Sequence, residues 1–154
     1  YLQAIQKLSP ALAVTQRACP SLVALIEEGR PQDDHILRAL ITEYLDDVMP
    51  LHPGVVLLGC THYPLVETAI AELMPSASIV DSADATARRV RQVLLAERAL
   101  SGRVGGGRLR CYVSDNPMRF REIGGRFLGA PGGLREVVWV TPEKFFHESV
   151  LQAE

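Results

Sequence analysis

The four apolar residues 55–58 (VVLL) limit the fold of the chain more than any other segment. A continuous run of this kind suits a strand that is covered on both faces, as in a parallel sheet. The residues GCTHYP (59–64) follow directly, and in them Gly59 lets the backbone approach a ligand closely while Pro64 can open a helix after a short turn. The pattern predicts a strand, a turn and a helix, which is the connection typical of a parallel α/β sheet.

Strand and helix patterns alternate along the rest of the chain. Helices are predicted over 20–29, 34–48, 64–74, 83–94 and 117–127, and short strands over 12–15, 55–58, 78–80, 109–113 and 137–140. Such an alternation indicates an α/β fold with right-handed crossovers. The long helix that starts at 83 and the glycine loop at 105–107 mark a place where the chain can pass from one domain to another.

Composition excludes several classes of protein. The 154 residues suffice for one domain, or for one domain and part of another. The formal charge of −2 leaves no basic surplus for nucleic acid, and the apolar runs are far shorter than the ~20 residues of a membrane span. We therefore expect neither nucleic acid nor a membrane as partner. The three cysteines include no CxxC pair, which favours reduced thiols in a cytoplasm.

The GCTHYP loop is the strongest candidate for a site, because ligands of open parallel sheets bind beyond the carboxyl ends of the strands. The start of the following helix favours an anion, and the same field with His62 nearby favours the thiolate of Cys60. One loop thus offers a thiol, an imidazole, the hydroxyl of Thr61 and a cradle for a carboxylate. Free cysteine is often inert packing, so a structural role of Cys60 is the alternative at this point.

Other polar residues have simpler interpretations. Cys19 lacks a neighbouring histidine and Cys111 lies inside a predicted strand, so we expect both to be packing residues. Glu27 belongs to an acidic pair at a helix end, which is typical of a solvated face. No metal site is predicted, because Cys60 and His62 would supply only two ligands and no second pair has ligand spacing.

The residues GCTHYPL (59–65) resemble the second-cysteine motif of the glutamate racemases. Three other segments resemble that family in the same order and spacing: RACP (17–20) with LIE (25–27), VDSA (80–83) with TA (86–87), and YVSDNP (112–117) with RF (119–120). The resemblance implies two α/β domains related by pseudo-two-fold symmetry with the active site between them. It also implies that no cofactor is needed, and that two cysteines, one from each half, flank the α-carbon of glutamate.

Residue by residue, the resemblance implies that Cys60 is the cysteine of the second half, the base towards L-glutamate and the acid in the reverse direction. Thr61 and His62 would contact the substrate, and His62 would also assist the thiol. Glu27 matches an acidic position that the family places near the site. The implied fold is a parallel-sheet, flavodoxin-like layered α/β domain with C-terminal elements belonging to a second similar domain. The implied product is D-glutamate for peptidoglycan.

The family's first half is missing from the resemblance: neither its Asp-Ser-Gly segment nor its first cysteine is present. The chain also starts at Tyr1 rather than Met, and we expect a fragment. Residues 1–83 would form most of the second domain, and 84–154 would return to complete the first.

We expect this chain alone to be inactive, and to associate as a homo-oligomer or with the missing N-terminal half. Two alternatives stay open: a non-catalytic, self-associating α/β fragment, and a racemase of the same superfamily acting on aspartate.

Overall fold

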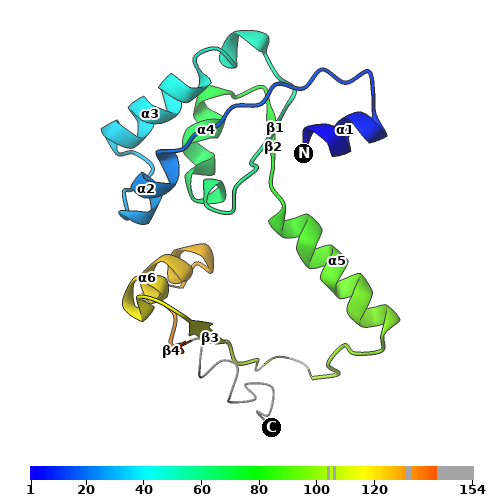
Figure 1. Ribbon diagram of the computed structural model, residues 1–154, viewed down its shortest axis with the longest axis vertical. Coiled ribbons are helices and arrows are strands. Elements are labelled where there is room, and N and C mark those ends of the chain that lie inside the picture. Colours follow the sequence, from blue (N-terminus) through cyan, green and yellow to red (C-terminus); the bar gives the residue numbers. More distant parts are fainter. Residues whose placement is uncertain (104, 106, 131–132, 142–154) are drawn as a thin grey trace. The chain divides into compact units, whose positions relative to one another are not determined.

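The computed structural model describes residues 1–103, 105, 107–130 and 133–141. The chain forms two units, Tyr1–Leu100 and Ser101–Glu154, and among the described residues each contains one two-stranded parallel sheet (Figure 1). The assignment of 1–83 and 84–154 to two domains of a larger enzyme stays a prediction, and part of the second range lies outside the described residues.

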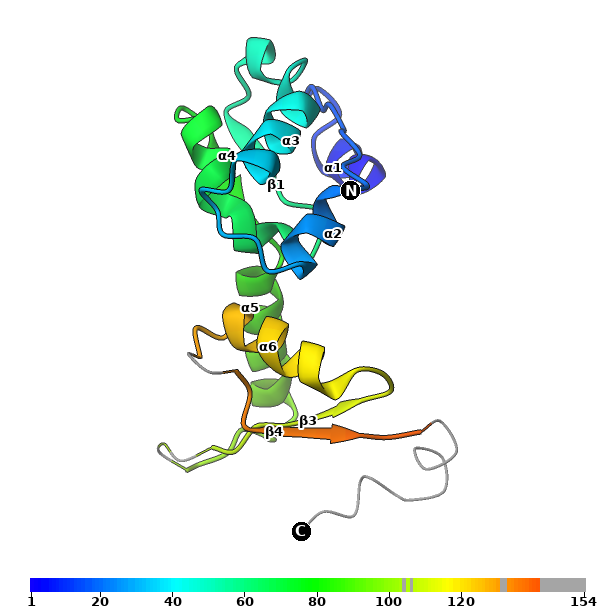
Figure 2. The ribbon, with the colours of Figure 1, turned by 90° about the vertical axis from the view of Figure 1, so that its left-hand side faces the viewer.

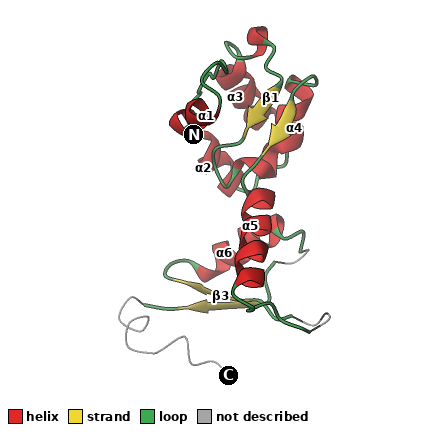
Figure 3. Cartoon of the chain, turned by 90° about the vertical axis from the view of Figure 1, so that its right-hand side faces the viewer, coloured by secondary structure: helices red, strands yellow, loops and turns green. Residues whose placement is uncertain are grey.

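The first unit alternates helices with two short strands. Its elements are α1 (Leu2–Leu8), α2 (Leu22–Glu27), α3 (His35–Leu45), the 3-10 helix η1 (Met49–Leu51), β1 (Val55–Leu57), the 3-10 helix η2 (Tyr63–Val66), α4 (Glu67–Leu73), β2 (Ser78–Val80) and α5 (Ala83–Ala96). β1 and β2 pair in parallel, with Val56 opposite Ile79, and η2 with α4 forms the connection between them (Figure 3). The predicted strands at 55–58 and 78–80 are therefore confirmed.

The core of the first unit collects apolar side chains from the helices α2, α3 and α4. The two buried residues of α2, and likewise those of α3, stand four positions apart on one helical face, whereas α4 contributes the neighbouring Ala69 and Ile70. Leu58, Val66 and Met74 add to the core from outside these three helices. Figure 2 shows these helices grouped beside β1. The buried side chains are Leu22, Ile26, Leu37, Ile41, Leu58, Val66, Ala69, Ile70 and Met74.

A side-chain cap starts α3 at the predicted place. The carboxylate of Asp34 accepts hydrogen bonds from the backbone N–H groups of Ile36 (3.0 Å) and Leu37 (2.9 Å). These donors would otherwise have no partner inside the helix. The bond from Leu37 is the main cause that lowers the pKa of Asp34, and Arg30 adds to it against the effect of burial.

The prediction that the strand at 55–58 is covered on both faces is wrong for the described residues. Val56 and Ile79 face the core, whereas the alternate residues Val55 and Val80 are 60% and 45% exposed. Successive side chains of a strand point to opposite faces, and the core helices cover only one of them. The other face of the sheet is therefore apolar and open.

The predicted strand at 12–15 is also wrong. These residues have no strand conformation, and the described pairing of β1 is with β2. A strand is stabilised by the backbone of a neighbour, and an apolar pattern alone does not supply that neighbour.

The second unit contains β3 (Arg110–Val113), α6 (Pro117–Phe127) and β4 (Glu136–Trp139), with Cys111 opposite Val137 in a parallel pair. The predicted strand, helix and strand are confirmed. The side-chain oxygen of Asn116 accepts from the N–H of Arg119 and caps α6. The guanidinium groups of Arg108 and Arg110 lower the pKa of Glu136 at the edge of this sheet.

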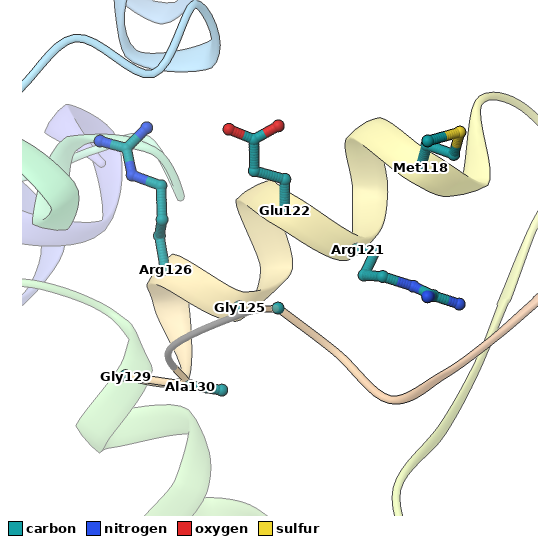
Figure 4. Close-up of a pocket in the computed structure, with 8 residues that line it drawn as sticks. Met118, Arg121, Glu122, Gly125, Arg126, Gly129 and Ala130 are labelled. Carbon is teal, nitrogen blue, oxygen red and sulfur yellow. The ribbon is translucent and has the colours of Figure 1, made fainter.

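Glycine allows α6 to approach the loop that returns to β4. A Cβ atom on Gly125 would lie 2.5 Å from the Cα atom of Gly133, so a larger residue does not fit there. Figure 4 shows Gly125 on α6 among the residues that line a pocket. The pocket is lined by Met118, Arg121, Glu122, Gly125, Arg126, Gly129, Ala130 and Gly133. Within the described part of the chain, no helix has both the length and the apolar character that crossing a membrane requires.

Candidate active site

The GCTHYP loop lies at the carboxyl end of β1, where the rule for parallel sheets places a site. The N–H of Leu58 still bonds the carbonyl of Val80 (2.8 Å), and the chain then leaves the sheet. The N–H of Tyr63 bonds the carbonyl of Cys60 (3.3 Å) and closes the turn that carries Cys60 and His62. The helix predicted from Pro64 begins as the 3-10 helix η2 and becomes α-helical at α4.

His62 joins this loop to α2. Its Nε2 atom lies 3.0 Å from Oε1 of Glu27, and both side chains are partly buried. Glu27 is the last residue of α2, whose Leu22 and Ile26 are buried in the core. Burial of these two side chains holds the helix against the loop and leaves Glu27 at its edge, beside the imidazole.

The other ring nitrogen of His62 faces the thiol. Nδ1 lies 4.0 Å from Sγ of Cys60 and 3.4 Å from Oγ1 of Thr61. An ionised carboxylate can only accept, so we assign a ring proton to Nε2 from the contact with Glu27, which leaves Nδ1 as the acceptor in the neutral ring. In this arrangement Nδ1 can take the proton of the Cys60 thiol and return it.

Cys19 and Tyr63 lie between the loop and the core of the first unit. The hydroxyl of Tyr63 donates to the backbone carbonyl of Cys19 (3.2 Å), and both side chains pack against the core. Burial raises the pKa of Tyr63 to about 12, and the neighbouring Cys19 and Cys60 add to the shift. Burial also raises the pKa of the Cys19 thiol, against the opposing effects of Tyr63 and Arg17. Cys19 is thus a packing residue, as the sequence predicts.

The structure brings the predicted residues Cys60, Thr61, His62 and Glu27 together, and their chemical roles stay predictions. The local pattern alone favours a solvated role for Glu27, and only the family resemblance places it near the site. Sequence analysis did not find Tyr63, whose position next to His62 was the available signal. Among the described residues, no group of three His, Cys, Asp or Glu side chains is placed to hold a metal ion.

Comparison with known proteins agrees with the resemblance. No family model matches the chain. A glutamate racemase of Syntrophus aciditrophicus is 38% identical over 130 residues, which are 84% of this chain and 48% of the relative. The chain spans about half the length of the curated relatives it matches.

Solved structures show the same likeness. Glutamate racemase from Francisella tularensis in complex with D-glutamate matches with a TM-score of 0.81 and 26% identity, over 94% of this chain and 53% of that one. Glutamate racemase from Thermus thermophilus in complex with β-chloro-D-alanine matches with a TM-score of 0.71 and 34% identity, over 84% and 48%. The predicted α/β class with parallel strands is confirmed, and the flavodoxin-like layering stays a prediction.

Proposed function

From the homology of the chain with the glutamate racemases over about half of their length, we propose that it is the C-terminal portion of such an enzyme. The complete enzyme interconverts L- and D-glutamate without a cofactor, in a cytoplasm, and supplies D-glutamate for peptidoglycan. The observation that carries the proposal is the chain of contacts from Glu27 through His62 to Cys60 at the carboxyl end of β1.

The chemistry assigned to this half is one proton transfer on one face of the substrate. Nδ1 of His62 takes the proton of the Cys60 thiol, and the thiolate then removes the α-proton of glutamate. The electron pair of the broken C–H bond stays on the substrate as a planar carbanion. In the reverse direction the Cys60 thiol returns a proton to the same face. The hydroxyl of Thr61, which is exposed beside Nδ1, contacts the substrate.

Inversion needs a second acid on the opposite face of the planar intermediate. We assign that acid to a cysteine of the missing half, because Cys19 is packed against the core and Cys111 lies within β3. The chain alone is therefore expected to be inactive as a racemase.

The open face of the β1–β2 sheet fits an incomplete domain. Parallel sheets are normally buried on both faces, but Val55, Leu57 and Val80 are exposed here. The match covers about half of each relative, so the missing half is the occupant that we assign to this face. Association of two copies of this chain is the alternative.

Co-expression with the N-terminal half of a related glutamate racemase tests the proposal. The chain alone should form no D-glutamate from L-glutamate, and the purified co-assembly should form it. Turnover by the chain alone would refute the incomplete site. A stable co-assembly without turnover would refute the proposed activity, and a dimer of this chain that excludes the other half would support the alternative.

A further inference from the structure

Two adjacent side chains of the site loop hold the two ends of α2. Nε2 of His62 contacts Glu27, the last residue of the helix, at 3.0 Å. The hydroxyl of Tyr63 donates to the carbonyl of Cys19, three residues before the helix begins, at 3.2 Å. Since α2 has six residues and rises about 1.5 Å per residue, these two contacts are separated by most of its length.

The carbonyl that Tyr63 contacts is part of the turn that starts α2. It also accepts from the N–H of Leu22 at 3.2 Å, which closes the turn. The N–H of Ser21, one residue earlier in the same turn, donates to the hydroxyl of Tyr44 on α3 at 3.2 Å. Two tyrosines from different elements therefore fix the start of this helix.

These hydrogen bonds fix the position of α2 along its axis, which apolar packing of the helix does not. Leu22 and Ile26 hold α2 against the core, but apolar burial has no preferred direction and tolerates small shifts along the helix axis. Hydrogen bonds weaken steeply when distance or angle departs from the optimum. The bond at the start of α2 consequently restricts shifts of the helix that carries Glu27 at its end.

We propose that Tyr63 is a positioning residue of the site: its hydroxyl fixes the start of α2, so that Glu27 reaches His62 and Nδ1 of His62 faces Cys60. The catalytic consequence of this role rests on the proposed function, whereas the positioning of Glu27 and His62 by Tyr63 does not depend on that function. With a pKa of about 12, the phenol of Tyr63 keeps its proton and stays a donor at neutral pH.

Ring-nitrogen NMR of ¹⁵N-labelled full chain tests the proposal without substrate. Glu27→Gln defines the displacement of the His62 Nε2 signal when the carboxylate is lost. Tyr63→Phe keeps the ring and removes only the hydroxyl, and it should displace the same signal by more than half as much. In the Glu27→Gln background, Tyr63→Phe should add almost nothing, because a residue that acts through Glu27 cannot act without it.

Tyr112→Phe in β3 is the matched control and should leave the His62 signals unchanged. Equal displacement by Tyr63→Phe in both backgrounds, or none in either, would overturn the positioning role. If Tyr63→Phe does not fold, Tyr44→Phe replaces it, because it removes the hydroxyl that α3 contributes to the same turn. Tyr44→Phe should then displace the His62 signal when Glu27 is present and not when it is combined with Glu27→Gln, and any other result overturns the proposal. A negative NMR result would leave the proposed racemase function intact. Absence of racemase turnover would leave the positioning role of Tyr63 intact.

Discussion

Nε2 of His62 lies 3.0 Å from Oε1 of Glu27, across 35 residues of sequence. This contact orients the imidazole so that its other nitrogen faces the Cys60 thiol. A histidine with one nitrogen held by a carboxylate has a defined tautomer, which a base that must accept a thiol proton requires. The pair thus connects the end of α2 to the loop that carries Cys60.

Replacing Glu27 tests this connection. In the co-assembled enzyme we expect Glu27→Gln to lower kcat by about 10-fold to 100-fold, because the imidazole loses its anionic partner and the preference for the proton on Nε2. Glu27→Asp, which keeps the charge on a shorter side chain, should lose less. Steady-state racemisation rates measure both variants. Equal rates for Glu27→Gln and the unmodified chain would show that the contact does not serve catalysis.

The cap of α3 predicts a pH dependence of stability. The folded-state pKa of Asp34 lies below its usual value, so its contribution is present above the unfolded-state pKa, and it is lost as the pH falls through the folded-state pKa. Asp34→Ala should therefore destabilise the chain at neutral pH, with a difference that shrinks in acid. Urea unfolding across this pH range measures the effect. A difference that grew in acid would contradict the assigned role of the carboxylate.

Burial of Ile26 predicts a large loss of stability on truncation. The side chain is 0% exposed in the core of the first unit, so Ile26→Ala should lower the free energy of unfolding by about 2–5 kcal/mol. Ile36→Ala, at a side chain that is 45% exposed, should change it by no more than about 0.5 kcal/mol. Chemical denaturation of the two variants provides the comparison, and similar losses would argue against this core.

Gly125 predicts a packing effect in the second unit. A Cβ atom there would lie 2.5 Å from backbone at Gly133, so Gly125→Ala should destabilise that unit by about 1–3 kcal/mol, although alanine favours helices. Gly102→Ala is the matched control, because no atom lies within 4 Å of its added Cβ. Amide hydrogen exchange of α6 measures the loss. Unchanged protection in Gly125→Ala would refute the close approach of helix and loop.

Local patterns predicted the elements of this chain better than its long-range contacts. The apolar run at 55–58, the helix predicted from 34 and the helix after Asn116 all depend on neighbouring residues, and the structure confirms them. The strand predicted at 12–15 failed because a strand depends on a partner that the local pattern does not contain.

The absence of long-range partners from a local pattern also limits what the sequence predicts about the site. The loop with Cys60 and His62 is contiguous, so its position after a strand was predictable. The contacts of Glu27 with His62 and of Tyr63 with Cys19 join residues 35 and 44 positions apart, and no local spacing encodes them. Family resemblance brought in Glu27, and only the fold revealed the contact of the Tyr63 hydroxyl at the start of α2.

Racemisation by the co-assembled enzyme in D₂O tests the central claim most directly, with the unmodified chain, Cys60→Ala and Cys111→Ala compared side by side. Cys60 is assigned as the acid/base of this half, whereas Cys111 lies in β3 outside the proposed machinery. We predict that the unmodified and Cys111→Ala chains form D-glutamate with deuterium at the α-carbon at similar rates. Cys60→Ala should be slower by about 10²–10⁴-fold. An unchanged rate in Cys60→Ala would contradict the account.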